Sequence, residues 1–413
     1  MPHHRARPAA SDRVADWAAS GVVALTGRAD GPPLVPPGRA ATVARELAER
    51  IGRASGGRVR VDGPRLLSER AAFTGHTRGG AVSAGGRCRL LPTSDGWATV
   101  SCARPDDPLL LGALVGADLT GDPWPALAAW LRAHLGAELA ERATLLGLAA
   151  APVDPPPPQV FPDLPPRSVE GLLVVDFSAL WAGPLCAHLL GLGGAQVVKV
   201  ETPTRPDGAR LGSPGFYRLL HAGHRSVVLD PSLPADRAGL AALVHAADIV
   251  IEASRPRALA GFGLDMQAAV AAGTTWISIT AAGRSSQRVG FGDDVAAAAG
   301  LVVYDAAGPV FCGDAIADPL TGLTAAALAL TAPADGSGVL WDVAMAGVVA
   351  ATLDAGPSAP AVAARPEGSG WMLDTPTGPV PVAVPQRRTV AGAAPAAGAD
   401  TAAVLAAVGV PAQ

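Results

Sequence analysis

The fold is decided by residues 171–201, GLLVVDFSALWAGPLCAHLLGLGGAQVVKVE. This segment reads as a buried strand at 171–177, a turn, a helix at 183–194 and a second strand at 196–200. Short apolar strands that alternate with helices predict a doubly wound α/β fold with a parallel sheet, which binds ligands at the carboxyl ends of its strands. The alternation continues with expected strands at 226–230, 248–253, 276–280 and 339–343, and helices at 235–246, 293–304, 317–332 and 344–353.

A proline-rich stretch, PVDPPPPQVFPDLPP at 152–166, precedes this region. Prolines favour a stiff and extended connector. Before it we expect helices at 12–25, 40–53, 124–135 and 137–147 and a hairpin at 83–103, and near the C-terminus a hairpin at 370–384 and a helix at 400–408. The expected parts are an N-terminal helical segment at 1–60, a second, smaller α/β domain at 61–155, the Pro-rich linker at 156–167, the large domain at 168–354 and an Ala/Pro-rich C-terminal segment at 355–413.

The composition restricts the partners. The 413 residues carry a net charge of −4, and a mildly acidic chain argues against nucleic acid or an anionic membrane as the main partner. The run from Pro319 to Ala334 lacks charges but is too short to cross a bilayer comfortably, so we expect a buried helix. The four cysteines do not stand at metal-ligand spacing. We therefore expect no metal and a reducing cytoplasmic location.

The segment GDAIADPLTG, residues 313–322, places Asp318 directly before Pro319 at the start of an expected helix. Aspartate at the N-cap with proline at N1 is a common helix start, which is a purely structural explanation. A functional explanation uses the same position, because the helix dipole keeps a carboxylate ionised there. In a dry cleft such a carboxylate can act as a nucleophile. Asp314, four residues earlier, is expected to be a turn residue.

A second acidic position is the pair Asp293 and Asp294, just before another apolar helix. These residues are either helix caps or a general acid/base that faces Asp318. Two other functions lack their motifs. The turn after the first strand is not G-x-G-x-x-G, so a dinucleotide-binding fingerprint is unsupported, and Ser178 does not stand in a G-x-S-x-G elbow.

Basic residues near strand ends are candidates for phosphate binding. Arg210, Arg225 and Arg255 are each expected in a loop beside a strand or helix. A single loop arginine is usually a solvated charge, but together at one sheet edge they can hold phosphates bidentately. Lys199 is the only lysine, so any lysine chemistry must fall on it.

These residues lie in blocks that resemble those of the family III CoA-transferases, the CaiB/BaiF family. The resemblance covers about 168–350 in order and spacing. The N-terminal part, with its Asp95-Gly96 hairpin and LLGLAAAPV at 145–153, is similar to the later half of that family, so the chain resembles a divergent member with a rearranged N-terminal segment. The blocks are VVDFSALWAGPLCAHLLGLGGAQVVKVE (174–201), HAGHRSVVLD (221–230), ADIVIEASRPRALAGFGLD (247–265), WISIT (276–280) and GDAIADPLTG (313–322).

The resemblance implies a chemistry. An aspartate at the position of Asp318 attacks an acyl-CoA thioester and gives a mixed anhydride, then an aspartyl-CoA thioester, and a free carboxylic acid reverses these steps. The second acidic position of the family falls at or next to Asp293. Coenzyme A is a substrate thioester, no metal is needed, and members are interlocked homodimers. The residues that the resemblance assigns to CoA are Trp181, Ala182, Gly183, Pro184, Lys199, Arg210, Arg225, Arg255 and Ala258.

Departures from the family pattern keep an alternative open. Trp181 stands where many transferases carry Gln or Leu, the Glu-Asn-Phe block is Glu252-Ala253-Ser254, and Thr202 replaces a residue that is often basic. A catalytically inactive CoA-binding member or subunit is therefore the alternative. An acyl-CoA racemase or isomerase is less favoured, because the family's racemases need a histidine where this chain has GFGDD, residues 290–294.

Overall fold

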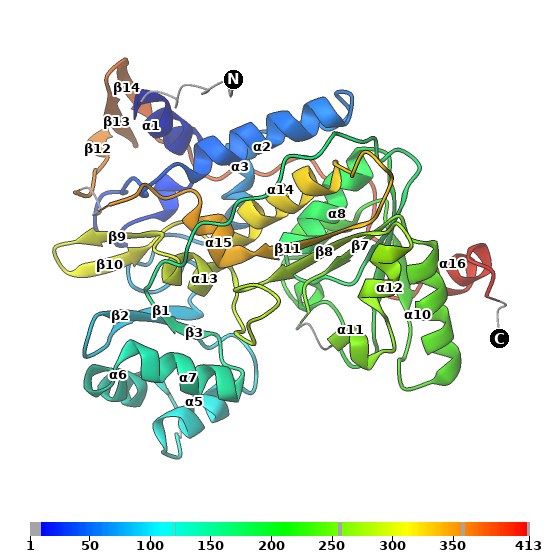
Figure 1. Ribbon diagram of the computed structural model, residues 1–413. Helices are drawn as coiled ribbons and strands as arrows, with labels where there is room; N and C mark the ends of the chain where they lie inside the picture. Colours follow the sequence, from blue (N-terminus) through cyan, green and yellow to red (C-terminus); the bar gives the residue numbers. More distant parts are fainter. Residues whose placement is uncertain (1–9, 120, 255–257, 357–359, 411–413) are drawn as a thin grey trace.

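The computed structural model describes residues 10–119, 121–254, 258–356 and 360–410. Its centre is a sheet of six parallel strands in the order β11-β8-β7-β4-β5-β6 (Figure 1). The predicted parallel, doubly wound α/β fold is confirmed. The strand order reverses between β4 and β7, the place where such sheets bind ligands. The strands are β4 (Leu173–Asp176), β5 (Gln196–Glu201), β6 (Arg225–Val228), β7 (Ile249–Glu252), β8 (Thr275–Thr280) and β11 (Val339–Ala344).

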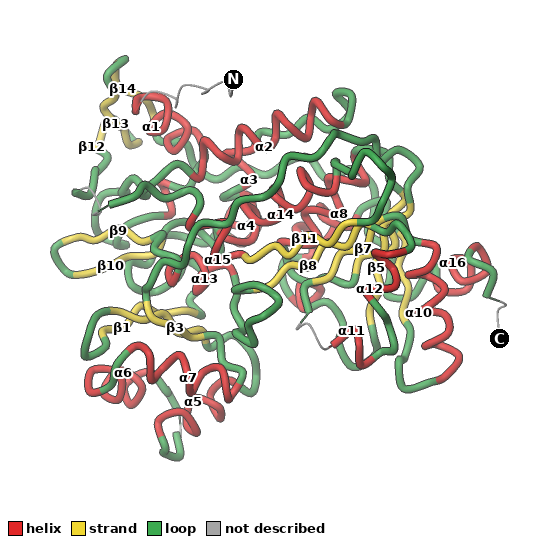
Figure 2. The backbone as a smooth tube through the Cα atoms, in the orientation of Figure 1, coloured by secondary structure: helices red, strands yellow, loops and turns green. Residues whose placement is uncertain are grey.

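Helices cover both faces of the sheet, as Figure 2 shows. Apolar residues predominate in β4 and β7 because both faces of these strands are buried. One face packs against α8 (Ala182–Leu192) and α14 (Ala317–Ala329), and the other packs against α10 (Pro234–Ala246). The two helices of the first face approach closely, since a Cβ at Gly322 of α14 would lie 2.6 Å from the carbonyl oxygen of Ala182. Helices α11 (Ala258–Gly261), α12 (Met266–Ala271) and α16 (Thr401–Ala407) lie on the α10 side (Figure 1).

The N-terminal helices lie on the α14 side of the sheet. Helix α2 (Ala40–Ala54) matches the prediction for 40–53 and shares one apolar core with α8 and α14. The helix expected at 12–25 is shorter, because Gly21 adopts a φ of +78° that ends the helical path. Its residues form α1 (Ala10–Ala19) and the turn η1 (Val23–Leu25). Helices α3 (Gly63–Leu66), α4 (Glu69–Thr74) and α9 (Pro214–His221) and the turn η2 (Gly208–Leu211) complete this side.

A second, smaller α/β unit has a core of its own (Figure 1). Its three-stranded antiparallel sheet contains the expected hairpin, whose turn is held by Asp95 through hydrogen bonds from Thr93 and from the Gly136 backbone. Both helices expected after the hairpin are present. The elements are β1 (Cys88–Pro92), β2 (Trp97–Ser101), β3 (Ala150–Pro152), α5 (Asp107–Val115), α6 (Trp124–Ala133) and α7 (Gly136–Leu146).

The helix expected at 293–304 is wrong over its second half. Helix α13 (Gly292–Ala298) ends before Gly300, which has a φ of +92°. The β-branched residues that follow favour a strand. They form a hairpin of β9 (Val302–Asp305) and β10 (Gly308–Phe311). The alanines before it favour a helix, so the sequence pattern predicted one continuous helix instead of a helix and a hairpin.

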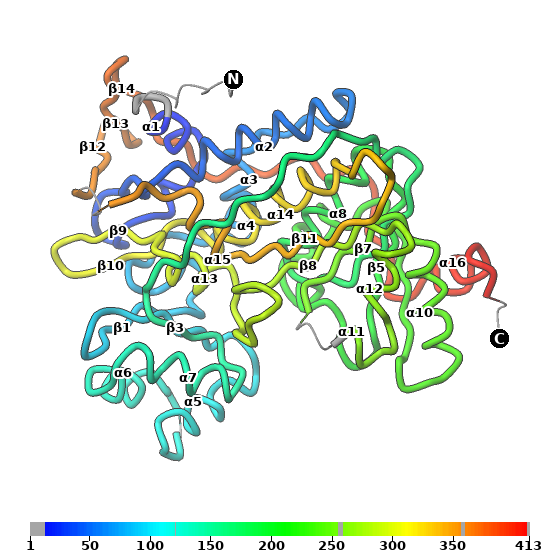
Figure 3. Tube along the Cα trace, viewed as in Figure 1, coloured from blue at the N-terminus to red at the C-terminus, as the bar shows by residue number. Residues whose placement is uncertain are grey.

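The Pro-rich linker and the C-terminal segment tie the parts together (Figure 3). Gln159 of the linker hydrogen-bonds the backbone of β11 and of α15 (Met345–Ala350). The C-terminal segment forms β12 (Arg365–Glu367), β13 (Gly370–Thr375) and β14 (Gly378–Pro381), and then crosses to α16 beside β6. Within the described residues, no helix has both the length and the apolarity needed to cross a membrane.

Candidate active site

Asp318 lies in the first turn of α14, the helix that the sequence predicted. Ile316, rather than Asp318, occupies the N-cap, so the expected capping role is wrong and Pro319 stands at N3 rather than N1. The side chain of Asp318 makes no capping hydrogen bond among the described residues and stays partly exposed, whereas the helix around it is buried. The carboxylate is therefore free for chemistry at the positive end of a helix.

The backbone before Asp318 is strained. Ala315 has a φ of +48°, which an alanine rarely adopts. Its carbonyl accepts the Asp318 N–H at 2.9 Å, and its own N–H donates to Asp293 Oδ1 at 2.7 Å. Strain of this kind persists where the surroundings fix it, and it gathers at functional sites.

The N-terminus of α13 faces Asp318. A Cβ placed on Gly292 would lie 2.5 Å from Asp318 Oδ2, so the carboxylate occupies the space that any other side chain would need. Asp294, at N3 of α13, caps the helix start, because its Oδ1 accepts the N–H of the N-cap residue Phe291 at 2.8 Å; the same oxygen lies 3.2 Å from the Ser101 hydroxyl. The sequence left capping and acid/base roles open for both aspartates, and the structure separates them: Asp294 caps and Asp293 faces the loop before α14.

Arg70 of α4 supplies positive charge to these acids. Its Nε and Nη2 donate to Asp314 at 2.9 and 2.5 Å, and the Nδ1 atom of His76 lies 3.2 Å from the same carboxylate. Asp314 is fully buried, so the expected turn residue is also one half of a buried ion pair. The guanidinium carbon of Arg70 stands 5.4 Å from the ring centre of Trp181. No local pattern in the sequence marks Arg70 or His76 as members of this site.

The balance of charge controls the protonation of the cluster. Burial raises the pKa of Asp318 to about 7, against the lowering effect of Arg70. Burial and the charge of Asp314 raise the pKa of Asp293 to about 6. The pKa of Asp314 is lowered instead, because the charge of Arg70 outweighs the effect of burial and holds this pKa below the usual range. Near neutral pH, Asp318 can thus exist as a carboxylate whose basicity exceeds that of an ordinary aspartate.

The turn after β4 brings residues 181–184 to the sheet edge. Trp181 is buried, with its Nε1 atom unpartnered within the described chain, and the next three residues form the buried first turn of α8. Gly183 is required there, since a Cβ would collide with Ser178. Leu180 has a φ of +69°. Because Gly322 stands one turn after Asp318 and touches Ala182, this turn lies near the acids.

The basic residues assigned to CoA are not gathered in one place. Lys199 is buried, hydrogen-bonds the Ser178 carbonyl, and lies 3.0 Å from Asp207 and 3.6 Å from Asp176. Arg210 pairs with Glu201 at the carboxyl end of β5, whereas Arg225 lies at the amino end of the neighbouring strand β6.

Two further CoA assignments fall at the edge of what the structure describes. Arg255 lies outside the described residues, and Ala258 begins α11. All CoA contacts therefore stay predictions. Among the described residues, no group of His, Cys, Asp and Glu could hold a metal ion.

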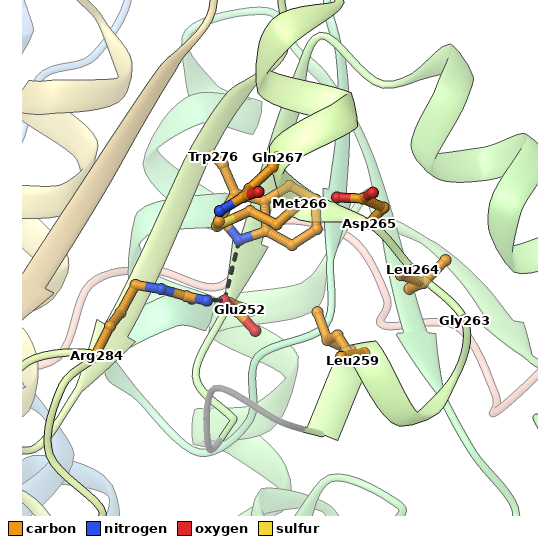
Figure 4. Close-up of a pocket in the computed structure, with 10 residues that line it drawn as sticks. Glu252, Leu259, Gly263, Leu264, Asp265, Met266, Gln267, Trp276 and Arg284 are labelled. Atoms are coloured by element: carbon orange, nitrogen blue, oxygen red, sulfur yellow. Dashed lines mark hydrogen bonds and ion pairs between the residues drawn. The ribbon is translucent and has the colours of Figure 1, made fainter.

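A cavity of about 420 Å³ lies at the carboxyl ends of β7 and β8 (Figure 4). Glu252 receives hydrogen bonds there from Trp276 Nε1 at 3.0 Å and Arg284 Nη1 at 2.6 Å. Trp276 belongs to the apolar cluster on the α10 side, and α14 packs on the other face. This cavity and Asp318 are therefore on different faces of the sheet.

Comparison with known proteins gives concordant matches. Residues 169–370 match the family model described as CoA-transferase family III. The succinate–glutarate CoA-transferase of Agrobacterium fabrum is 33% identical over 120 residues, which are 25% of this chain and 30% of that protein. The succinyl-CoA–D-citramalate CoA-transferase of Chloroflexus aurantiacus is 30% identical over 183 residues, 41% of this chain and 46% of that protein.

The matches are partial. The chain spans less than half the length of either curated relative. A solved CaiB/BaiF family protein from Brucella suis is 28% identical over 45% of this chain and 55% of that chain, with a TM-score of 0.40.

Proposed function

We propose that this chain, in which residues 169–370 belong to CoA-transferase family III, moves CoA from an acyl-CoA thioester to a free carboxylic acid, with Asp318 as the nucleophile. The observation that carries the proposal is the environment of the Asp318 carboxylate. Its carboxylate is partly exposed, serves no capping role and stands at the start of a buried helix among other acids. A carboxylate of raised basicity is a better nucleophile than an ordinary aspartate.

The first half of the reaction loads the enzyme. Asp318 attacks the thioester carbonyl, the C–S bond breaks, and the products are a mixed anhydride and the CoA thiolate. The thiolate then attacks the aspartyl carbonyl of the anhydride. An aspartyl-CoA thioester forms, and the donor acid leaves as a carboxylate.

The second half of the reaction repeats the same bond changes in the opposite order. The acceptor carboxylate attacks the aspartyl-CoA thioester, which gives a second anhydride and frees the thiolate again. Attack of the thiolate on the acceptor's acyl carbon forms the new acyl-CoA and restores Asp318. We assign Asp293 to proton control, because two acids this close do not ionise independently. The pKa of Asp293, about 6, lies below that of Asp318, about 7, so Asp293 loses its proton first and its charge makes Asp318 the more basic member of the pair.

The substrates are proposed by class. The two relatives named above act on succinate and glutarate and on succinyl-CoA and D-citramalate by their names, so short acids with more than one carboxylate are the first acceptors to test. CoA would lie across the carboxyl edge of the sheet, with its pantetheine beside residues 182–184. The working unit would be a cytoplasmic homodimer.

The test is a transfer assay with a trap. The purified chain is incubated with succinyl-CoA and a panel of acids, and hydroxylamine captures an acylated carboxylate as a hydroxamate that mass spectrometry maps. Transfer by the wild type and a hydroxamate on Asp318 are expected, and Asp318→Asn should lose at least about 10³-fold in rate. Asp118→Asn, at an exposed acid of the smaller unit, is the matched control.

The alternative function has a distinct outcome. An inactive CoA-binding member would bind CoA in a titration and yet give no hydroxamate with any acid. Full activity in Asp318→Asn would contradict the assignment of the nucleophile.

A further inference from the structure

Arg70 is held in one orientation by contacts on two sides. Its guanidinium donates to both oxygens of Asp314, and its central carbon lies over the indole of Trp181, 5.4 Å from the ring centre. Among the described residues, its Nη1 atom makes no hydrogen bond. A bidentate pair of this kind fixes an arginine more firmly than a single contact does. The positive charge is therefore fixed in place at the acid cluster.

The groups around Asp318 are mostly acidic. Asp293 and Asp294 come from α13, Asp314 comes from the turn before α14, and Arg70 comes from α4. His76 faces Asp314 from the loop after α4. Of these groups Arg70 alone favours the carboxylate form of Asp318, and the three aspartates oppose it.

We propose that Arg70 is a positioning residue for the reaction: its charge is fixed on Asp314, in the turn that leads into Asp318, where it favours the carboxylate form of the nucleophile, and Asp314 limits this effect. The inference rests on the proposed function, and it adds a role for the N-terminal segment that the family model does not cover, since that model matches residues 169–370 only. Asp314 takes two of the donors of Arg70, so part of the positive charge is neutralised before it acts on Asp318.

A purely structural role for the Arg70–Asp314 ion pair predicts a different outcome from an effect of Arg70 on Asp318. If Arg70 only compensates the burial of Asp314, then removing either partner destabilises the protein, and the ionisation of Asp318 changes little. If Arg70 acts on Asp318, the two removals have opposite effects. Loss of Arg70 leaves Asp318 among acids and harder to ionise, whereas loss of the Asp314 charge leaves the full charge of Arg70 for Asp293 and Asp318.

The experiment measures the pH dependence of kcat/KM from pH 5 to 9. The variants are Arg70→Met, Arg70→Lys and Asp314→Asn, with Arg53→Met at the exposed end of α2 as the control. The acidic limb should move up by about one pH unit in Arg70→Met and down in Asp314→Asn. Arg70→Lys should restore part of the wild-type profile, because it keeps the charge but loses the bidentate geometry.

A second readout does not depend on activity. The carboxyl ¹³C resonance of Asp318, assigned by its loss in Asp318→Asn, gives the titration midpoint of this residue directly. The midpoint should rise in Arg70→Met and fall in Asp314→Asn. Shifts in the same direction, or an unchanged midpoint in both variants, overturn the proposal. If Arg70→Met does not fold, the Arg70→Lys and Asp314→Asn midpoints decide.

The two proposals fail separately. An inactive wild type with opposite midpoint shifts contradicts the transferase function and supports the role of Arg70. An active wild type with no such shifts does the reverse.

Discussion

Gly292 and Asp318 share one small space: the position of a Cβ on Gly292 lies 2.5 Å from Asp318 Oδ2. The same Cβ would lie 2.5 Å from the carbonyl oxygen of Ala315. Both contacts are closer than non-bonded atoms can be. The glycine therefore lets the start of α13 and the start of α14 meet at the carboxylate.

Gly292→Ala should displace Asp318. We expect transfer activity to fall at least about tenfold and the free energy of unfolding to drop by about 1–3 kcal/mol, as overpacking usually costs. Urea denaturation and the transfer assay measure the two effects. Gly96→Ala is the control, because a Cβ there meets nothing within 4 Å, and equal behaviour of the two variants would contradict the packing argument.

Asp294→Asn should stabilise the protein at high pH. Burial raises the pKa of Asp294 to about 7, so the folded state binds this proton more tightly than the unfolded state does. The stability that this provides is present below about pH 4 and is lost as the pH rises to about 7. Asparagine keeps the capping oxygen and has no charge to bury. We expect the variant to exceed the wild type by about 4 kcal/mol at pH 8 and to match it at pH 4; a difference that does not depend on pH would rule out titration of Asp294 as the cause.

Lys199→Met separates a structural role from CoA binding. Two buried carboxylates, Asp176 and Asp207, lose their cation in this variant. We expect a loss of about 3–5 kcal/mol in the free energy of unfolding, as for other broken buried pairs. The double variant with Asp207→Asn should recover part of it. A stable Lys199→Met protein with a raised KM for acyl-CoA would instead assign the lysine to a phosphate.

Arg388→Met should destabilise the protein at α4, because it removes the cation that pairs with Glu69 at the start of this helix. Arg388 of the C-terminal segment donates to both oxygens of the buried Glu69, at 2.8 and 2.7 Å. Thermal and urea unfolding should show a loss of about 3 kcal/mol, because Glu69 is left buried and unpaired. Arg365→Met, in an exposed ion pair, is the control and should cost less than about 1 kcal/mol. Similar losses in both variants would show that burial of Glu69 is not the cause.

Much of the fold was predictable because its signals are local. The strands of the sheet are short, mainly apolar runs, and α14 starts at Ala317, two residues before the first helical position that Asp318-Pro319 predicted. The hairpin of β9 and β10 was not predicted, because its local signals are weaker than those of the alanines before it. An alanine-rich run favours a helix, and only Gly300 and the valines after it indicate the change of structure.

The acid cluster was predictable only in part. Asp318 and Asp293 could be named because each stands at a helix start. Arg70 could not, because its partner Asp314 is 244 positions away and nothing local relates them. Lys199 was assigned to CoA as the chain's only lysine, and its burial between two carboxylates depends on the loop that carries Asp207, which no strand or helix pattern places.

The distance along the chain between Arg70 and Asp314 has a consequence for synthesis. A ribosome adds roughly 5–20 residues per second, so the arginine emerges roughly 10–50 s before the aspartate that holds it. Through that interval the nascent polypeptide has the cation without the nucleophile. The acid cluster around Arg70 can therefore form only after the start of α14 has been synthesised.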